Sequence, residues 1–390
     1  MTPRLTDPAA LAQALIRCPS ITPEEAGALN LLEHLLGDLG FDCERLTFSA
    51  PGTADVENLY ARRGSEGRNL CFAGHSDVVP VGELSAWSVD PFAGTIRDGL
   101  LYGRGAVDMK GSIAAFIAAV ARTLETVDAQ RHKTIGSLSL LITADEEGPA
   151  INGTVKVLDW LKDKGETLDH CLVGEPTSAQ QLGDMVKIGR RGSLNGLITV
   201  YGIQGHSAYP HLADNPLHHM VRMLSPLVDE AIDDGNDYFQ ASSLQLTSID
   251  VNNAATNVIP GLGQAHFNCR FNSNHQSEDI VAWVHERLGR EGARYDLEIS
   301  VSGESFLCPP GEWTTLVVGS VEKVLGSEPE LSTTGGTSDA RFIKDHCPVA
   351  ELGLLNATAH KVDEHVPIGD LEKLTQIYQQ IIKTYFSNQT

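Results

Sequence analysis

Short apolar runs alternate with amphipathic stretches through the first half of the chain. A helix is expected at 9–17, because Thr6-Asp7-Pro8 provides a capping residue and a proline at the first helical position. Three later runs have the length of buried strands, and segments with helical periodicity separate them. The expected strands are 69–74, 137–143 and 170–174, and the expected helices are 23–38, 113–124 and one ending over 158–164. This alternation predicts βαβ units and a mostly parallel sheet.

Between about residues 192 and 302 the pattern changes to half-exposed strands and longer helices. The strands are expected at 193–201, 242–251, 263–271 and 295–301, and the helices at 215–232 and 277–290. The order β-α-β-β-α-β is the ferredoxin-like unit. A helix at 312–325, a strand at 349–355 and a helix at 370–386 then resume the first pattern. We therefore expect an α/β domain of residues 1–182 and 302–390, interrupted by an inserted α+β domain of residues 183–301.

Charge excludes one large class of partners. The chain has 390 residues, of which 51 are acidic and 29 basic, and its formal net charge is −22. A field of that sign repels phosphates, so we expect no nucleic-acid partner. The apolar runs are shorter than the roughly 18–20 residues that cross a bilayer, so we expect no membrane partner either. The N-terminal segment has Asp7 and Pro8 where a secretory signal would have an apolar core.

The cysteines indicate a reducing compartment. Seven cysteines are scattered along the chain without a C-x-x-C pair. An odd, scattered set is a poor disulfide framework and a poor cysteine zinc site. We therefore expect buried, reduced thiols and a cytoplasmic protein.

Histidine and acidic residues follow the predicted strands. Ligands of open parallel sheets lie outside the carboxyl ends of the strands, so these side chains are expected to converge there. Without a cation, several carboxylates in one cleft would repel one another or take up protons. Imidazoles with carboxylates suit zinc, with cobalt or manganese as similar alternatives. His75, Glu146, Glu147, Glu175 and His360 follow expected strands, and a sixth candidate, Asp108, lies at a loop-to-helix junction.

Eight motifs spread over essentially the whole chain resemble the di-zinc aminoacylase/carboxypeptidase family. In order they are GHSD, GRGAVDMKG, TADEEG, VGEPT, QGHSAYPH, NVIPG, GGTSDARF and NATAHKVDE. A small departure is Ser76, where relatives commonly have threonine. The resemblance implies a zinc-exopeptidase-like catalytic domain with an inserted dimerisation and lid domain, acting as a homodimer with a small-molecule dicarboxylate amide as substrate.

The resemblance also implies a ligand set. Asp108 would bridge two Zn²⁺ ions, for which Co²⁺ can substitute. One ion would take His75 and Glu175, and the other Glu147 and His360. His365 competes with His360, which is preferred because it follows the strand directly and matches the family's position.

Three further residues would act around the metals. Asp77 would hold the second ring nitrogen of His75 through its carboxylate. Glu146 would be the general base on the attacking water. By the resemblance, His206 would reach the oxyanion from the partner subunit, whereas His211, His218 and His219 are expected to be surface histidines.

Substrate anions need cations in a chain this acidic. Arg190 and Arg270 are the proposed carboxylate contacts, while Arg191 is either a second contact or a solvated hinge charge. A Gly-rich loop is expected to contribute Thr337 and Ser338, with Asn257 and Asn356 as amide donors.

The segments GRRGS and NATAHK narrow the expected reaction. They resemble family members that hydrolyse N-succinyl-LL-2,6-diaminopimelate to succinate and LL-2,6-diaminopimelate, in lysine and diaminopimelate biosynthesis. The alternative is an acetylornithine deacetylase or a related N-acyl-amino-acid hydrolase. A non-catalytic relative would have lost a ligand or the base, and this chain retains all of them.

Overall fold

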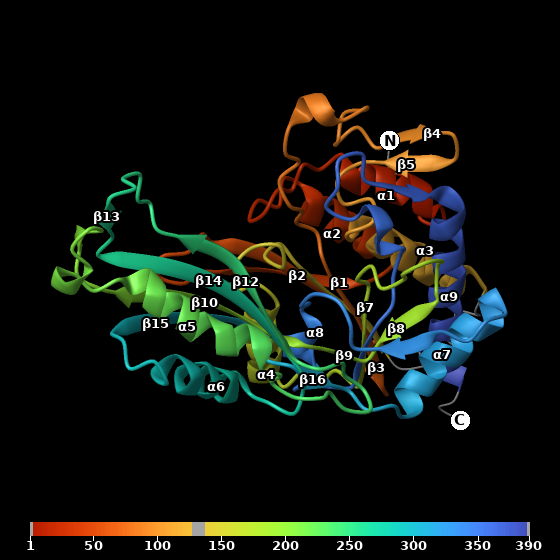
Figure 1. Ribbon diagram of the computed structural model, residues 1–390. Coiled ribbons are helices and arrows are strands. Elements are labelled where there is room, and N and C mark those ends of the chain that lie inside the picture. Colours follow the sequence, from red (N-terminus) through yellow and green to blue (C-terminus); the bar gives the residue numbers. More distant parts are fainter. Residues whose placement is uncertain (1–2, 127–136, 388–390) are drawn as a thin grey trace. The chain divides into compact units, whose positions relative to one another are not determined.

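The computed structural model describes residues 3–126 and 137–387, which fall into two compact units (Figure 1). Unit 1 is formed within 1–188, 308–332 and 338–390, and unit 2 by 189–307 and 333–337. The sequence placed these boundaries a few residues earlier, at 183 and 301. Strand pairing explains the difference. The strand β8 (Met185–Lys187) pairs with β17 (Glu330–Ser332) in unit 1, while β16 (Phe306–Leu307) pairs with β9 (Gly189–Arg190) in unit 2.

Unit 1 is built on an eight-stranded sheet with the order β1-β2-β6-β3-β7-β18-β8-β17. The adjacent strands β6, β3, β7 and β18 are parallel, and antiparallel pairs lie on both sides of them. β3 and β6 are buried along their whole length, as parallel strands covered on both faces are. The remaining bounds are β1 Asp42–Phe48, β2 Val56–Arg63, β3 Asn69–His75, β6 Ser137–Thr143, β7 His170–Val173 and β18 Val349–Glu351.

The helices of unit 1 pack in two groups. α3 packs against α1 and α9, and its first twelve residues, 110–121, are buried. Phe72 of β3 stacks on Phe116 of α3 at 4.3 Å between ring centroids. α4 packs against β6 and α8. The bounds are α1 Pro8–Ile16, α2 Ala28–Asp38, α3 Lys110–Thr126, α4 Thr154–Lys164, α7 Glu312–Leu325, α8 Ala340–Ile343 and α9 Ile368–Ser387.

A small second sheet and short 3-10 turns complete unit 1. The sheet has the order β19-β5-β4. Its strands are β4 Thr95–Arg97, β5 Leu100–Tyr102 and β19 His365–Pro367, and the turns are η1 Leu84–Ala86 and η4 Asn356–Thr358. None of the helices within residues 3–126 and 137–387 combines the length and apolar composition that crossing a bilayer requires.

Unit 2 has its own four-stranded antiparallel sheet, ordered β12-β14-β10-β15, with α5 and α6 packed on it. Its core includes Leu194, Met223, Phe267 and Val284. β11 and β13 form a separate pair, beside the turn η3 Pro210–Leu212. The bounds are β10 Gly192–Tyr201, β11 Gly205–His206, α5 Pro216–Asp229, β12 Ser243–Asp250, β13 Val258–Ile259, β14 Leu262–Phe271, α6 Ser277–Gly289 and β15 Tyr295–Gly303.

The predicted fold class is confirmed: a mixed α/β unit with a mostly parallel central sheet, interrupted by an α+β segment with β-α-β-β-α-β order. Some details differ. The helix expected at 23–38 begins only at Ala28, because Ala26 and Gly27 adopt left-handed φ values of 45° and 87°. The strand expected at 349–355 ends at Glu351. The sequence analysis missed β1 and β2, which form an antiparallel edge of the large sheet.

Candidate metal centre

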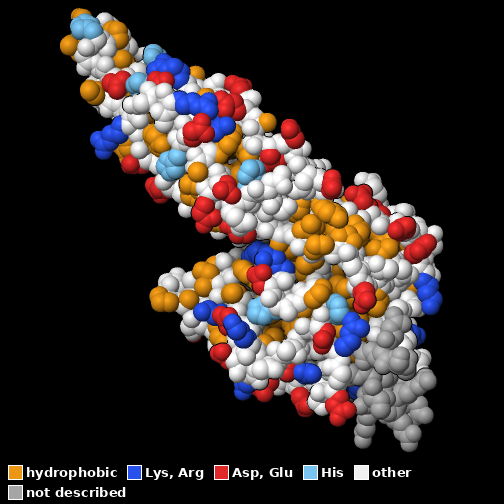
Figure 2. Space-filling view, turned by 90° about the horizontal axis from the view of Figure 1, so that it is seen from below, with side chains coloured by type: hydrophobic (Ala, Val, Ile, Leu, Met, Phe, Trp, Pro, Cys, Tyr) orange, Lys and Arg blue, Asp and Glu red, His pale blue; other side chains and the backbone are white. Residues whose placement is uncertain are grey.

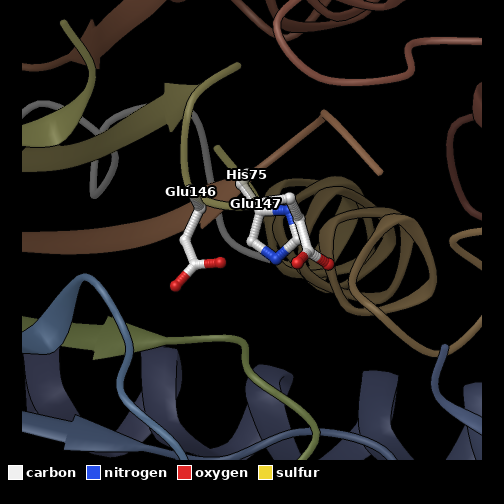
Figure 3. Close-up of side chains that lie close together, drawn as sticks. All are labelled: His75, Glu146 and Glu147. Carbon is white, nitrogen blue, oxygen red and sulfur yellow. The ribbon is translucent and has the colours of Figure 1, made fainter. Parts of the chain in front are cut away.

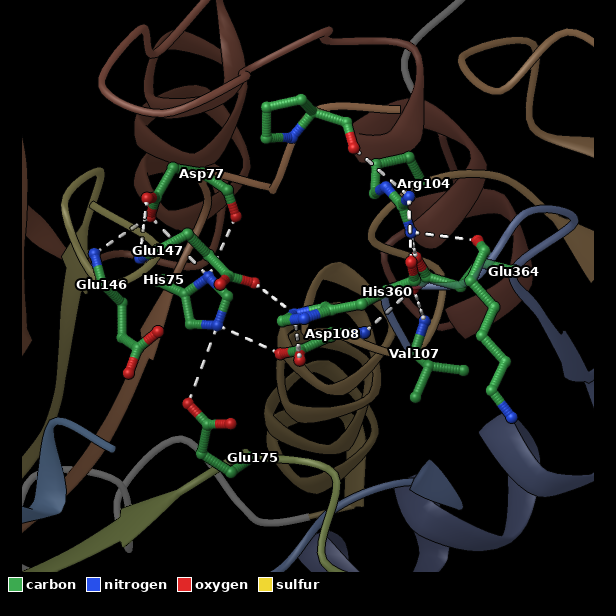
Figure 4. Close-up of polar contacts among 12 residues, drawn as sticks. His75, Asp77, Arg104, Val107, Asp108, Glu146, Glu147, Glu175, His360 and Glu364 are labelled. Carbon is green, nitrogen blue, oxygen red and sulfur yellow. Dashed lines mark hydrogen bonds and ion pairs between the residues drawn. The ribbon is translucent and has the colours of Figure 1, made fainter. Parts of the chain in front are cut away.

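Two glycines allow Asp108 to approach the ends of β3 and β7. Gly74 precedes His75, and Gly174 precedes Glu175. A Cβ atom at Gly74 would collide with the Met109 side chain, and one at Gly174 would lie 2.7 Å from Met109 Cε. Because both glycines lack that atom, Met109 packs over the strand ends. The preceding residue, Asp108, is thereby held beside the two strand-end side chains (Figure 4).

The carboxylate of Asp108 lies between two imidazole rings. Its Oδ1 is 3.1 Å from His75 Nε2, and its Oδ2 is 3.2 Å from His360 Nε2. His75 Nε2 is also 3.6 Å from Glu175 Oε1, and His360 Nε2 is 2.8 Å from Glu147 Oε1. Each oxygen of Asp108 therefore faces a different histidine–glutamate pair, as a carboxylate bridging two cations does.

Three groups of candidate metal ligands occur within the described residues, and in each group the ligand atoms lie within 4.8 Å of one another. Two groups share Asp108, so their donors form one continuous set of imidazole and carboxylate ligands. That donor chemistry fits a pair of divalent cations. The groups are His75–Asp108–Glu175, Asp108–Glu147–His360 and His75–Glu146–Glu147.

The consecutive residues Glu146 and Glu147 point in different directions. In the close-up, their carboxylates lie on opposite sides of the His75 ring (Figure 3). Glu147 reaches His360, as described above, whereas Glu146 belongs only to the group with His75 and Glu147. Burial, and then the neighbouring carboxylates of Asp339 and Glu147, raise the pKa of Glu146. A carboxylate with a raised pKa is a better proton acceptor near neutral pH than an ordinary glutamate.

Asp77 orients His75, but through a different atom from the one expected. His75 Nδ1 donates to the backbone carbonyl of Asp77 at 2.9 Å, while the Asp77 carboxylate lies 3.7 Å away. That carboxylate accepts the backbone N–H groups of Glu146 at 3.4 Å and Glu147 at 3.1 Å. Burial raises the pKa of Asp77 to about 6. Asp77 therefore positions two segments that carry candidate ligands.

The pKa shifts of His75, Asp108 and His360 show that this cluster of carboxylates favours positive charge. Hydrogen bonds to Asp108 and Glu147 raise the pKa of His360 to about 10. Burial alone would lower the pKa of His75, but Asp108 and Glu175 outweigh it and raise that pKa. Burial would raise the pKa of Asp108, yet the two histidines lower it. These shifts favour positive charge on the two rings, and divalent cations held by the same residues would also compensate the carboxylates.

The structure brings His360, and not His365, to Asp108 and Glu147. His360 adopts a φ of 61°, which is costly for a residue with a side chain and is typical of functional positions. His365 Nδ1 donates to the Asp363 carbonyl at 2.7 Å, and its ring packs against Tyr102.

The sequence analysis missed a buried ion pair behind the ligands. Arg104 Nη1 donates to Glu364 Oε2 at 2.7 Å, across a separation of 260 residues. Both residues lie inside motifs quoted above: Arg104 in GRGAVDMKG and Glu364 at the end of NATAHKVDE. Their burial was the missing signal, since local sequence does not relate residues so far apart.

The arginines proposed to bind substrate belong to unit 2. Arg190 is buried in β9, and its Nη1 donates to the Gly336 carbonyl at 3.0 Å. Arg270 lies in β14 opposite Ser193, and its Nε donates to Asn268 Oδ1 at 3.1 Å. Burial lowers the pKa of Arg270. Arg191 is partly buried.

His206 and Asn257 are exposed in unit 2, near the β11–β13 pair. His206 Nδ1 accepts the backbone N–H of Ala208 at 3.0 Å. The Asn257 carbonyl accepts the N–H of Ser207 at 3.0 Å. As expected, His211 and His218 are exposed or partly exposed, but His219 bonds Glu291 and Asp214, each at 2.8 Å.

The Gly-rich loop is divided between the units. Thr337 is partly buried and is the last residue of this loop in unit 2. Ser338 belongs to unit 1 and is fully buried, and its hydroxyl donates to Glu351 Oε1 at 2.8 Å. Asn356 is exposed at the start of η4, and its backbone N–H donates to the Ser178 carbonyl. Of these three, Ser338 is the one whose side chain is engaged in the interior.

On the face shown in Figure 2, acidic side chains are spread among basic and apolar ones. The net charge of −22 is therefore not gathered at one place on this face. The acidic cluster around Asp108 is distinguished by burial: Asp108 and Glu175 are 9% and 8% exposed. Buried charges of one sign require compensating partners, which is what a metal centre provides.

Known proteins match this chain over nearly all of its length. It is 56% identical over 381 residues to succinyl-diaminopimelate desuccinylase of Rhodospirillum centenum, covering 98% of each chain. The aminopeptidase PepT of Bacillus cereus has a TM-score of 0.78 at 19% identity, covering 99% of this chain and 100% of that one. The Bacillus subtilis YXEP protein, described as a dinuclear metal-binding peptidase of the M20 family, has a TM-score of 0.68 at 14% identity, with 98% of each chain covered.

The family expected from the motifs is confirmed. The model of peptidase family M20/M25/M40 matches residues 71–384, which include all six candidate metal-site residues. The low-identity solved structures agree with this at the level of the fold. The chain belongs to peptidase family M20/M25/M40.

Proposed function

We propose that this chain is a metal-dependent amidohydrolase that converts N-succinyl-LL-2,6-diaminopimelate to succinate and LL-2,6-diaminopimelate, in lysine and diaminopimelate biosynthesis. The relative in Rhodospirillum centenum, 56% identical, and one in Parvibaculum lavamentivorans, 53% identical over 385 residues, both carry the name succinyl-diaminopimelate desuccinylase. The observation that carries the chemistry is the position of Asp108, whose two oxygens each face a different histidine.

The ligands would divide about Asp108. His75 and Glu175 would hold one Zn²⁺, and Glu147 and His360 the other, with Co²⁺ as a working substitute. The distances of 2.8–3.6 Å between these side chains support that division. Bound cations of this kind polarise a carbonyl and lower the pKa of water.

Glu146 would move the proton. It takes a proton from the attacking water, and the resulting hydroxide attacks the amide carbon of the succinyl group. As the C–N bond breaks, Glu146 returns that proton to the nitrogen of the leaving diaminopimelate, and succinate is released. Its raised pKa and its direction away from Glu147 support this role. Asp77 would keep Glu146 and Glu147 apart by holding their backbone N–H groups.

The substrate carries several carboxylates, which need cationic partners. Arg190 and Arg270 would bind them as forked donors. Asn257, Asn356 and Thr337 would supply neutral hydrogen bonds. Ser338 would contribute from its position beside Glu351, through the loop that it anchors.

His206 would stabilise the tetrahedral oxyanion from the partner subunit of a homodimer. Because its Nδ1 accepts the Ala208 N–H, the neutral ring carries its proton on Nε2, which is the donor an oxyanion requires. Dimerisation would use the inserted segment. Its exposed apolar residues Val221, Val228 and Ile249, which are 69%, 60% and 57% exposed, support a contact surface there. The seven free cysteines support a cytoplasmic location.

The test compares two substrates on the zinc-loaded protein. Steady-state kcat/KM is measured for N-succinyl-LL-2,6-diaminopimelate and for N-acetylornithine, with metal analysis of the same preparation. We expect two zinc ions per chain and a preference of at least about 10²-fold for the succinyl substrate, because unpaired arginines would penalise an acyl group that lacks a carboxylate. Equal rates, or a preference for N-acetylornithine, would make the substrate assignment wrong while leaving the metal centre standing.

A further inference from the structure

A buried ion pair lies directly behind the metal-ligand residues. The side chains of Arg104 and Glu364 are 3% and 0% exposed, and their guanidinium and carboxylate groups meet at 2.7 Å. The second carboxylate oxygen of Glu364 accepts two backbone N–H groups, from Val107 at 2.8 Å and Asp108 at 3.2 Å. Glu364 therefore binds the backbone of the residue whose side chain faces both histidines (Figure 4).

Arg104 extends the same network to two other segments. It donates to the backbone carbonyls of His360 at 3.4 Å and Lys361 at 3.2 Å. It also donates to the carbonyl of Pro80 at 3.4 Å, in the loop that follows His75 and Asp77. The segments carrying His75, Asp108 and His360 thus share one guanidinium and one carboxylate.

We propose that Arg104 and Glu364 are positioning residues that set the geometry of the metal centre by fixing the backbone of Asp108 and of the His360 segment. This inference rests on the proposed metal centre. Neither side chain needs to touch a cation, since its effect is exerted through the peptide groups of the ligand segments. Partners of this kind orient metal ligands, and their loss typically costs about 10–100-fold in metal affinity or activity.

A contribution to folding stability alone does not explain why the Arg104–Glu364 ion pair is buried behind the candidate ligands. Burying two charges is costly, and well-packed apolar residues often stabilise a core equally well. Within the described residues, the Glu364 carboxylate accepts hydrogen bonds from Arg104 and from the backbone N–H groups of residues 107 and 108, which include the candidate bridging residue. An ion pair that only stabilised the fold would not need to hydrogen-bond the backbone of Asp108, the candidate bridging residue.

The chain offers a second Arg–Glu pair as a control for the loss of an ion pair, one whose side chains are 23% and 41% exposed instead of 3% and 0%. Arg122 and Glu372 form a two-point pair between α3 and α9, at 2.6 Å and 2.7 Å. Arg122 also bonds the Thr6 carbonyl, so this pair contacts no segment that carries a candidate ligand. Removing its charge measures the cost of a lost Arg–Glu pair in the same unit.

The experiment titrates Zn²⁺ into metal-free full-length wild type, Glu364→Gln and Glu372→Gln, against a chelator of known affinity. Thermal unfolding of each metal-free protein reports the structural cost. Both variants are expected to unfold at lower temperature, but only Glu364→Gln is expected to bind Zn²⁺ about 10–100-fold more weakly. In the loaded enzyme, kcat is expected to fall by a similar factor while KM changes little, because the substrate contacts are left in place.

Arg104→Lys keeps a buried cation beside Glu364 while losing the fork that reaches several carbonyls, so it provides a second, milder variant. We expect it to fold and to lose Zn²⁺ affinity to a smaller degree than Glu364→Gln. Wild-type Zn²⁺ affinity in Glu364→Gln, or in Arg104→Lys if the other variant does not fold, would overturn the inference. Wild type that binds no metal at all would instead overturn the metal centre itself, and the inference with it.

Discussion

The candidate ligands of unit 1 and the candidate substrate-handling residues of unit 2 are held in different ways. In unit 1, His75, Asp108 and Glu175 are nearly buried, and partners within the unit set their directions. The side chain of His360 is 49% exposed, but Asp108 and Glu147 of the same unit hold its ring. In unit 2, His206 and Asn257 are exposed near a short two-stranded pair. The candidate ligands converge on one another, whereas His206 is exposed and its Nδ1 accepts the backbone N–H of Ala208.

The ligand cluster of unit 1 is already arranged within its own unit, whereas His206 of unit 2 would act only after a ligand or another subunit reaches it. A cluster of buried carboxylates and imidazoles is costly unless a charge completes it, so its geometry already implies a cation. An exposed histidine implies nothing until a ligand or another subunit meets it. From this comparison we expect that unit 1 holds metal by itself, and that any contribution of unit 2 requires a ligand or a second subunit to reach it.

Metal removal is expected to have the largest effect, and it tests the role assigned to unit 1. Exhaustive chelation is expected to abolish turnover, and added Zn²⁺ or Co²⁺ to restore it, since neither Glu146 nor His206 can replace the Lewis acid. Activity is followed on the succinyl substrate, with the residual metal content measured in parallel. Full activity in a protein shown to be metal-free would contradict the role of unit 1.

Glu146→Gln tests, within unit 1, whether Glu146 transfers the proton while Glu147 binds metal. Metal content is expected to remain near two ions per chain, while kcat falls by about 10²–10⁴-fold because the proton acceptor is lost. Glu147→Gln is the matched control one residue away, and it is expected to lose affinity for one ion because Glu147 is the partner of His360. If Glu146→Gln lost its metals, or kept near-normal kcat, the two roles would have been assigned the wrong way round.

His206→Ala tests recruitment from another subunit. We expect kcat to fall by about 10²–10³-fold with metal content unchanged, as for the loss of one oxyanion donor. Mixing inactive Glu146→Ala chains with inactive His206→Ala chains should restore activity, because one site of each heterodimer then has both groups. No recovery in verified heterodimers would show that His206 serves its own chain or has no part in the reaction.

Gly174→Ala tests how unit 1 preorganises its ligands. The new methyl group would lie 2.5 Å from Phe72 Cζ and 2.7 Å from Met109 Cε, so both side chains must shift, and we expect the shift of Met109 to displace Asp108. Overpacking of this kind costs about 1–3 kcal/mol, and we expect weaker Zn²⁺ binding as well as a lower unfolding temperature. Gly37→Ala in α2 is the control, because a Cβ atom there meets open space. Unchanged Zn²⁺ affinity in Gly174→Ala would show that Phe72 and Met109 move without displacing Asp108.

The smallest effect concerns His219 in unit 2, whose pKa is raised by its hydrogen bond to Glu291 and then by the one to Asp214. A raised folded pKa gives stability that is complete below the unfolded pKa of about 6.5 and is lost as pH rises through the folded pKa. His219→Gln should therefore destabilise the protein more at pH 5.5 than at pH 9, measured by denaturant unfolding. The same difference at both pH values would mean that this histidine does not titrate with folding.

Some features of this protein were determined by the sequence alone. The period of the apolar positions predicted the central helices and strands, because burial on one stripe or on both faces leaves a direct record in local sequence. Four of the six clustered side chains, His75, Glu146, Glu147 and Glu175, could be predicted to meet because parallel strands place their carboxyl ends together. Asp108 and His360 lie on connecting segments, and the motifs that contain them indicated that they join the cluster. The order of the motifs was enough to identify the family.

Other features were decided only by tertiary structure. That Asp77 holds His75 by its carbonyl, and Glu146 and Glu147 by its carboxylate, depends on the path of the backbone between strands. The unit boundary at Gly189 depends on β8 pairing with β17, more than a hundred residues away. The pairing of Arg104 with Glu364 depends on a contact across 260 residues. Local sequence records the preferences of neighbouring residues, whereas these contacts arise when distant segments bury the same polar groups and must satisfy them together.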